Sequence, residues 1–336
     1  MNSRQMSKKL YLHIGSPKTG TSTVQNFLFH QQDLLEKHGV TYFKNLCDKI
    51  EQHFELFRNF DENLERVQNE LVECNYEIGI MSTELLVFLV NNNLYSELIR
   101  RFFEFCLFQD IEVEVIGVIR EPFSYVISAY GEDVIGGRCP YNFRDWLLTS
   151  QGKGHMHVIK SFMKWENISD DVATRWYPFE LDTTHENIVE IIVHKLLGNR
   201  VSKKEIANII GKKIVRASYH GYIIEAVRRL NAETITHWDS YMGSENYHFI
   251  DKNRADFEDL TNSPQFISEQ ICSLKLDDFK MQINEMDLSY GSIRWVDGFS
   301  AINNINLEDY LTRTLSKLSY DENLVDQLCH KWRGKI

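Results

Sequence analysis

Short runs of apolar residues, separated by amphipathic segments, make up roughly the first two-thirds of this 336-residue chain. The clearest run is 111–119, IEVEVIGVI, which is rich in β-branched residues. Nearly continuous apolar runs are typical of parallel strands that are covered on both faces. On this basis we predict five strands, at residues 10–14, 40–43, 76–81, 111–119 and 172–179.

The segments between these runs have the apolar spacing of helices. Pro122 follows the run at 111–119 directly and suits the first turn of a helix. We expect helices from the turn after residue 14 to about Lys37, across much of 45–74, over 85–108, from Pro122 to the glycines at 136–137, and over 187–197. Strands that alternate with helices at this rhythm predict an α/β fold, with a central, mostly parallel β-sheet flanked by helices.

The pattern changes after about residue 201, where it becomes helical and irregular without a strong strand. We therefore expect a core over residues 8–230 and a mainly helical C-terminal extension over 231–336 that packs on it. Residues 231–305 have the least regular pattern in the chain.

Charge and cysteine content narrow the class of protein. The formal net charge of −11, with no basic tract, argues against a nucleic-acid partner. The six cysteines are scattered without a C-x-x-C pair, as is typical of free thiols in a reducing cytosol. No apolar run is long enough to cross a bilayer, and the first nine residues lack the apolar segment of a signal peptide. We expect a soluble cytoplasmic protein without an integral membrane segment.

The first candidate site is the turn GSPKTGTST that follows the strand at 10–14. A helix begins here, and its first N–H groups and dipole favour an anion such as phosphate or sulfate. The lysine adds a full charge, and the second glycine lets the backbone approach a ligand. The motif is not Walker A, because the lysine precedes that glycine. An ordinary strand–turn–helix with a polar turn is the alternative. The candidate residues are Ser16, Pro17, Lys18, Thr19, Gly20, Thr21, Ser22 and Thr23.

A second candidate anion site lies at the end of the strand at 111–119. Arg120 follows that strand directly, and Ser128 comes eight residues later. Arginine holds phosphate in a planar fork, and ligands collect at the carboxyl ends of parallel strands. Together with Lys18, this site indicates a ligand with anionic groups at both ends. A structural salt bridge of Arg120, for example with Glu121, is the alternative.

These two segments resemble the bacterial sulfotransferases that use 3′-phosphoadenosine 5′-phosphosulfate (PAPS). HIGSPKTGTSTVQ is similar to that family's 5′-phosphosulfate loop, and VIGVIREPFSYVISAYGEDV is similar to its 3′-phosphate motif. Weaker similarities, at 81–84 (MSTE), 177–180 (YPFE) and 216–231, extend the resemblance over roughly residues 10–231. The resemblance implies the P-loop NTPase-like sulfotransferase fold.

The resemblance also implies a reaction and a role for each motif. A sulfuryl group would pass in line from PAPS to an acceptor hydroxyl, on a glycan or glycolipid in this branch. Lys18 would stabilise the leaving group, the rest of the turn would hold the 5′-phosphate, and Arg120 with Ser128 would hold the 3′-phosphate. No Walker-B-like aspartate ends the strand at 111–119, which fits a reaction without a metal and counts against a kinase or NTPase.

Transfer to a hydroxyl needs a general base. Glu84 is the first candidate, because it follows a predicted strand end; related cytosolic enzymes carry a histidine at a similar place. His53 is the second, since relatives often have a histidine in this region. Each has a structural alternative: Glu84 as an acid in the first turn of a helix, and His53 as a partly buried helix residue.

Weaker candidates complete the sequence-based picture. Tyr177 or Phe179 could stack on adenine or belong to the core, and Arg216 or Ser218 could contact phosphate or begin a helix. The segment 152–158, GKGHMHV, which contains His155 and His157, is expected to be a polar loop. Two other functions stay open: a small-molecule kinase with a variant phosphate loop, which would need Mg-ATP, and a non-catalytic nucleotide-binding relative.

Overall fold

The computed structural model describes most of the first 234 residues and a few segments beyond them. The described residues are 8–47, 53, 57, 59–84, 86–120, 122–179, 188–198, 200–210, 221–234, 293 and 322–333. The chain divides into two compact units. The first unit comprises Met1–Glu121, Val158–Ala217 and Ser289–Ile302, and the second comprises Pro122–His157, Ser218–Leu288 and Asn303–Ile336.

This division differs from the boundary expected at residues 230 and 231. The second unit includes Pro122–His157, which lies well inside the expected core. Most of the expected extension over 231–336 lies outside the described residues. Its mainly helical character therefore stays a prediction, apart from one helix near the C-terminus.

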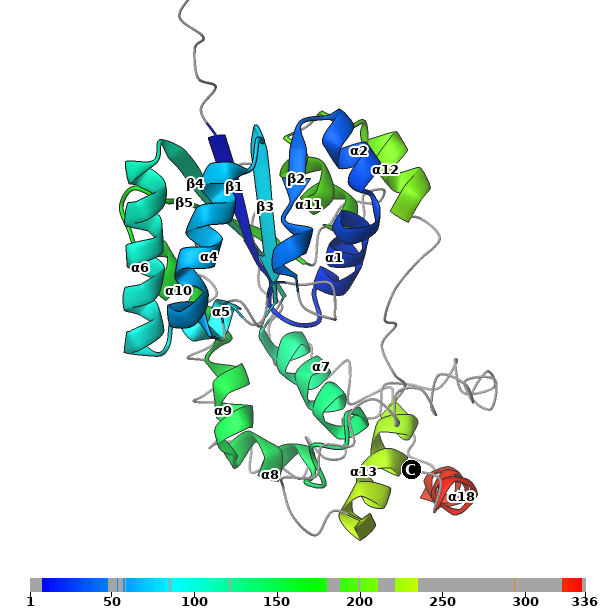
Figure 1. Cartoon of the computed structure of the whole chain (residues 1–336). Helices are drawn as coiled ribbons and strands as arrows, with labels where there is room; N and C mark the ends of the chain where they lie inside the picture. The colour runs from blue at the N-terminus through cyan, green and yellow to red at the C-terminus, as the bar shows by residue number, and fades with distance from the viewer. Residues whose placement is uncertain are drawn as a thin grey trace, which may run out of the picture. The chain divides into compact units, whose positions relative to one another are not determined.

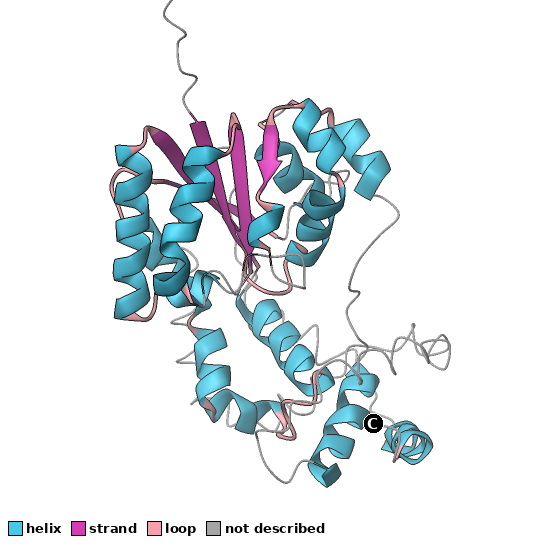
Figure 2. Ribbon diagram, viewed as in Figure 1, coloured by secondary structure: helices cyan, strands magenta, loops and turns pink. Residues whose placement is uncertain are grey.

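The first unit is built on a five-stranded, all-parallel sheet (Figure 2). The strand order is β2-β3-β1-β4-β5, so β1 lies at the centre between β3 and β4. The strands are β1 (Lys8–Ile14), β2 (Val40–Tyr42), β3 (Ile78–Thr83), β4 (Ile111–Ile119) and β5 (Ala173–Pro178). All five predicted strands and the α/β fold class are thus confirmed.

Helices cover both faces of this sheet (Figure 1). One face carries α1 (Thr21–His30), α2 (Gln32–Lys37), α11 (Ile188–Leu196) and α12 (Lys203–Ile210). The other carries α4 (Phe60–Glu73), α6 (Asn93–Phe108) and α10 (Val158–Glu166). The short α5 (Leu86–Leu89) packs against α10, and a 3-10 turn, η1 (Lys44–Leu46), follows β2.

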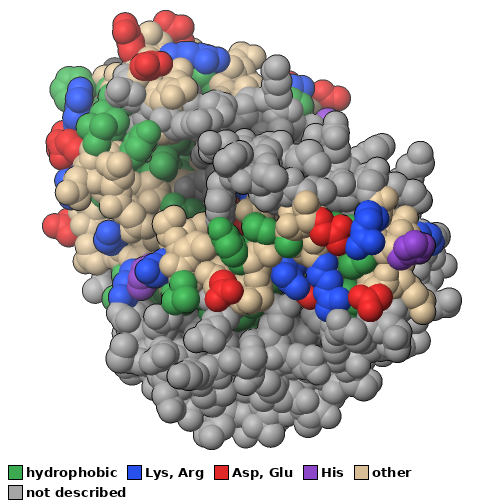
Figure 3. Space-filling model, turned by 90° about the horizontal axis from the view of Figure 1, so that it is seen from below, with side chains coloured by type: hydrophobic (Ala, Val, Ile, Leu, Met, Phe, Trp, Pro, Cys, Tyr) green, Lys and Arg blue, Asp and Glu red, His purple; other side chains and the backbone are tan. Residues whose placement is uncertain are grey.

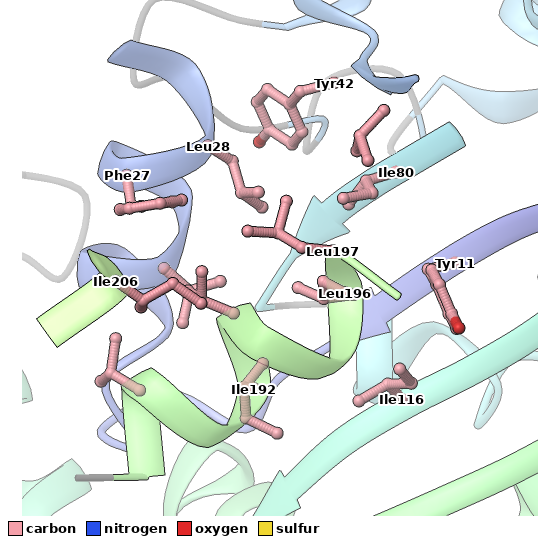
Figure 4. Close-up of a cluster of buried hydrophobic side chains, with 14 of the residues drawn as sticks. Tyr11, Phe27, Leu28, Tyr42, Ile80, Ile116, Ile192, Leu196, Leu197 and Ile206 are labelled. Atoms are coloured by element: carbon pink, nitrogen blue, oxygen red, sulfur yellow. The ribbon is translucent and has the colours of Figure 1, made fainter. Parts of the chain in front are cut away.

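The core on the α1 side is aliphatic with a few aromatic rings (Figure 4). Leu28 of α1 and Ile192 of α11 are fully buried against Ile80 and Ile116 of the sheet. Because each of these strands is covered on both faces, its residues are apolar almost without alternation, which is the pattern that identified the strands.

Two predicted helices are interrupted in the structure. The helix expected to reach Lys37 breaks at Gln31, and the helix expected over 85–108 is divided into α5 and α6. The second break falls in the run Asn91–Asn92–Asn93, where the Asn92 side chain accepts a hydrogen bond from the Leu94 N–H at 2.9 Å. Asparagine favours this N-cap position because its oxygen pairs with an N–H that the helix leaves open.

The second unit is helical in its described part. It contains α7 (Pro122–Ile135), α8 (Phe143–Leu148), α9 (Ser150–Met156), α13 (Gly221–Thr234) and α18 (Glu322–Trp332). Asn231 of α13 donates hydrogen bonds to the carbonyls of Val134 and Cys139, which ties α13 to α7 and the turn after it. The helix α7 begins at Pro122, as predicted.

The polar loop expected around His155 is wrong. His155 lies in α9, and its Nδ1 is 2.8 Å from the hydroxyl of the buried Tyr125. The Thr149 hydroxyl accepts a hydrogen bond from the Gly152 N–H and so caps this helix. The two glycines of the segment, Gly152 and Gly154, favour a loop prediction. The Thr149 cap and the buried contact of His155 nevertheless stabilise the helix.

Charged side chains of both signs alternate over the face in Figure 3. Several cations of the second unit pair locally, including Arg229 with Asp326 at 3.1 Å and Arg333 with Glu233 at 2.7 Å. None of the described helices has the length and apolar character that crossing a membrane requires. The described cysteines are all free thiols, as predicted; Cys272 lies outside the described residues.

Candidate functional site

The turn between β1 and α1 has the backbone shape of an anion-binding loop. Lys18 and Gly20 both adopt positive φ, at 67° and 81°. Gly20 is the N-cap of α1 and offers no side-chain hydrogen bond, and the first turn of α1 contains no acidic residue. N–H groups at a helix start, together with left-handed turn residues, form concavities that suit anions. This geometry supports the anion site predicted from the sequence.

Two glycines allow the chain to fold back in this way. A Cβ on Gly15 would come within 1.8 Å of the Thr21 side chain, and a Cβ on Gly20 within 2.8 Å of Val189. Gly20 also has a φ that L-residues rarely adopt. The sequence pattern points to Gly20 but not to Gly15, where a side chain is excluded only by the packing of Thr21.

Three of the five hydroxyls in the turn are used inside the protein. Ser16 donates to the Val118 carbonyl at 3.2 Å, Thr19 to the Ser16 carbonyl at 2.7 Å, and Thr21 to Glu84 Oε2 at 2.8 Å. A hydroxyl has one proton to donate, so these three fix the shape of the turn. The donors that this arrangement presents to a ligand are the backbone N–H groups and the half-buried Ser22 and Thr23.

Arg120 lies beside this turn at the end of the neighbouring strand. Its Nη1 donates to the Lys18 carbonyl at 3.4 Å, and its guanidinium carbon lies 5.0 Å from the centre of the Phe179 ring. Such a cation–π contact restrains the side chain. The structure therefore brings Arg120 to the backbone of Lys18, although 102 residues separate them in the sequence. Ser128 is a half-buried residue of α7 in the second unit.

Glu84 reaches the same turn from the other side of β1. It follows β3 directly, and its carboxylate accepts the hydrogen bond from Thr21, the first residue of α1. Glu84 therefore lies at the start of α1. A carboxylate at this point can accept a proton from a hydroxyl group that approaches the turn.

His53, the second candidate base, is fully buried. Its Nδ1 accepts a hydrogen bond from the Ser82 N–H at 3.1 Å, and its Nε2 lies 3.1 Å from the Phe43 carbonyl. These partners select the neutral tautomer with the proton on Nε2. Burial lowers the pKa of this imidazole to about 4. Both nitrogens hold backbone groups together, so the geometry favours Glu84 over His53 as the base.

Sequence reasoning missed a buried polar group beneath the turn. His13 and Ser82 are paired across β1 and β3, with His13 Nδ1 2.8 Å from Ser82 Oγ. Gln25 of α1 donates to the same Ser82 Oγ at 3.2 Å. His13 Nε2 has no hydrogen-bond partner among the described residues, and burial lowers the pKa of His13 to about 4. The available signal was a histidine inside the apolar run LYLHI.

The remaining sequence candidates are two aromatic residues at the end of β5 and two residues outside the described part of the chain. Tyr177 belongs to the hydrophobic core, whereas the half-buried Phe179 lies under Arg120. Arg216 and Ser218 lie outside the described residues. Within the described part of the chain, no group of three or more His, Cys, Asp or Glu side chains has an arrangement suited to a metal ion.

Comparisons with known proteins give little guidance. No protein-family model matches the chain, and a search of curated proteins gives no match. Among solved structures, the chain is similar to one from a study of the PezAT chromosomal toxin-antitoxin system of the human pathogen Streptococcus pneumoniae. That similarity has 12% sequence identity and a TM-score of 0.26, and it covers 61% of this chain and 85% of that chain. A similarity this low carries no argument about function.

Proposed function

We propose that this protein is a sulfotransferase that transfers the sulfuryl group of PAPS to an acceptor hydroxyl. The observation that carries the proposal is the meeting of three strand ends at one turn. Arg120, after β4, donates to the Lys18 carbonyl, and Glu84, after β3, accepts from Thr21. Two cations, a helix start without a side-chain cap and a carboxylate therefore share one place.

Each of these groups has a role in sulfuryl transfer. The acceptor oxygen forms a bond to sulfur while the bond from sulfur to the 5′-phosphate oxygen breaks, and negative charge develops on the leaving phosphate. Lys18 and the N–H groups of the turn stabilise that charge. Glu84 takes the proton of the acceptor hydroxyl, and the Thr21 hydroxyl orients its carboxylate. Arg120 holds the 3′-phosphate through a charged hydrogen bond.

The class of acceptor rests on the sequence resemblance, which points to a sugar hydroxyl of a glycan or glycolipid. A broad screen of saccharide acceptors with radiolabelled PAPS tests it. Transfer to a sugar hydroxyl supports the proposed class, and transfer to another class of hydroxyl with no saccharide product would correct it.

Calorimetric titration with 3′-phosphoadenosine 5′-phosphate tests the donor site directly. We expect the unmutated protein to bind this product and Arg120→Ala to weaken binding much more for it than for adenosine 5′-phosphate, which lacks the 3′-phosphate. Arg100→Ala is a matched control, because Arg100 is an exposed residue that pairs with Glu97 on α6. Absence of binding by the unmutated protein would sink the proposal.

Two substitutions, Glu84→Gln and His53→Gln, distinguish the candidate bases. Glu84→Gln keeps a group that can accept from Thr21 but removes the base, so we expect transfer to fall roughly 100-fold or more while nucleotide binding remains. His53→Gln should reduce stability, since His53 holds Ser82 and Phe43 in the interior. Transfer that survives Glu84→Gln and disappears in a folded His53→Gln protein would reverse the assignment.

A small-molecule kinase is a second candidate, because Glu84 supplies an acidic group at a strand end beside the turn, which a Mg-ATP enzyme needs. ATP turnover that depends on magnesium, with no response to PAPS, would favour it. A non-catalytic relative would instead bind the nucleotide but transfer nothing to any acceptor, with Glu84 and His53 both dispensable.

A further inference from the structure

Two hydrogen bonds of matched spacing join α1 to β3. Thr21 donates to Glu84 at 2.8 Å, and Gln25 donates to Ser82 at 3.2 Å. We refer to these two bonds as the α1–β3 link. The helix residues are four apart, which corresponds to a rise of about 6 Å; Ser82 in β3 and Glu84 just after its end are two apart, which corresponds to about 6.6 Å of extended chain. The two rises agree closely, so both bonds form without distortion of either element.

The inner bond of the link is held much more firmly than the outer one. Ser82 is fully buried, and Gln25 is 4% exposed, whereas Glu84 is only half-buried. Ser82 Oγ also contacts His13 Nδ1, and the Ser82 backbone exchanges hydrogen bonds with His53. Ser82 thus connects α1, β1 and β3, the three elements that carry the turn and Glu84.

We propose that Gln25 and Ser82 are positioning residues that hold the Glu84 carboxylate in line with the donor-binding turn. This inference rests on the proposed function, in which Glu84 is the base. Neither residue touches the reacting atoms. They act through the spacing of the link: with the inner bond formed, the outer bond places Glu84 against the first residue of α1. A displacement of about 1 Å in such an arrangement can cost roughly 100-fold in rate.

The test uses Ser82→Ala and the nearly isosteric Gln25→Met. We expect each variant to lose roughly tenfold or more in turnover, while affinity for 3′-phosphoadenosine 5′-phosphate stays within about threefold. The double variant should be no worse than the poorer single one, because both changes break the same bond. Ser161→Ala is the matched control: Ser161 is equally buried and accepts a hydrogen bond from Asn91 at 2.7 Å on the other face of the sheet.

The possible outcomes distinguish a positioning role of Gln25 and Ser82 from a general structural role. Turnover in Ser82→Ala and Gln25→Met equal to that of Ser161→Ala overturns the proposal, and so does a parallel loss of nucleotide affinity, which would indicate general structural damage. Hydrogen–deuterium exchange on α1 and β3 needs no substrate and should increase in both variants. If the unmutated protein binds no nucleotide, the proposed function fails, and unchanged exchange in the two variants would show separately that the link does not hold these elements.

Discussion

The two ends of the same parallel sheet both concentrate charge, but they use it differently. In the amino half, the buried carboxylate of Glu114 on β4 pairs with Lys9 at 2.7 Å, Arg175 at 2.6 Å and Lys195 at 3.4 Å. At the carboxyl ends, Lys18 and Arg120 lie beside the start of α1, which has no side-chain cap.

The difference lies in what surrounds each group of cations. Burial alone would raise the pKa of Glu114, but the hydrogen bond from Lys9 and the charges of Lys195 and Arg175 outweigh it and hold that pKa below its ordinary value. The amino half is therefore an internal ion-pair network. At the carboxyl ends, backbone N–H groups and cations gather around a turn, and the neighbouring carboxylate is held at its side. The density of charge is similar at the two ends, and the orientation of the donors is what supports the proposed ligand site at the carboxyl ends.

The largest effect on function should come from Lys18→Ala. We expect turnover to fall roughly 100- to 1,000-fold, because in the proposed reaction Lys18 stabilises charge on the leaving phosphate. Stability should change little, since alanine meets the same positive-φ constraint as lysine. Steady-state transfer assays and chemical denaturation measure the two quantities. Lys37→Ala, at an exposed position in the last turn of α2, should leave both unchanged; full activity of Lys18→Ala would contradict the assignment.

In the amino half of the sheet we expect a substitution to reduce stability strongly and to leave nucleotide binding nearly unchanged. Glu114→Ala should cost about 3 kcal/mol of unfolding free energy, because it leaves three partly buried cations without their carboxylate. Nucleotide affinity should remain within about twofold of that of the unmutated protein, which corresponds to a few tenths of a kcal/mol of binding free energy. Glu112→Ala removes an exposed partner of Lys9 and should cost less than about 1 kcal/mol. A large loss of nucleotide affinity in Glu114→Ala would remove the distinction between the two ends.

A smaller effect should follow from Gly20→Ala in the turn. The new Cβ meets Val189 and forces an L-residue into a positive φ, so we expect a loss of about 1 to 2 kcal/mol in stability and weaker nucleotide binding. In Gly154→Ala, the new Cβ meets nothing within 4 Å in the helix α9, and stability should rise by about 0.5 to 1 kcal/mol. Thermal denaturation compares the two; equal responses would show that the turn imposes no special constraint.

The dependence of stability on pH also distinguishes the two ends of the sheet. His13, His53 and His155 have pKa values lowered to about 4, by burial in each case and by Arg138 in addition for His155. Below the ordinary value of 6.5 the unfolded chain binds protons that the folded state does not, so stability should fall from pH 6.5 toward pH 4. His13→Gln should reduce that slope by about 1.4 kcal/mol per pH unit.

Glu114 should respond in the same direction but at lower pH. Its pKa is depressed in the folded state, so its contribution is present above the ordinary value of 4.5 and is lost as the pH falls through the folded-state value. Glu114→Ala should therefore flatten the stability profile below pH 4.5 and leave the slope between pH 4.5 and 6.5 unchanged. Denaturation curves across this range check both expectations, and a His13→Gln profile identical to that of the unmutated protein would contradict the first.

The sequence by itself determined the α/β class, the five strands and the place of the turn that we propose as an anion site. These features are encoded locally: an apolar run predicts a buried strand, and a turn of small residues before an amphipathic segment predicts a helix start. Arg120 and Glu84 could be named as site residues for the same reason, because both follow apolar runs that parallel strands bring to one edge of a sheet.

Only the tertiary structure decided which side chains bond to one another. The links Thr21–Glu84, Gln25–Ser82 and His13–Ser82 join residues 57 to 69 positions apart. A hydrogen bond depends on distance and angle to within a few tenths of an ångström, and no local pattern carries that information across two strands and a helix. The candidate residues could therefore be named from the sequence, whereas packing decided which of them bond to one another.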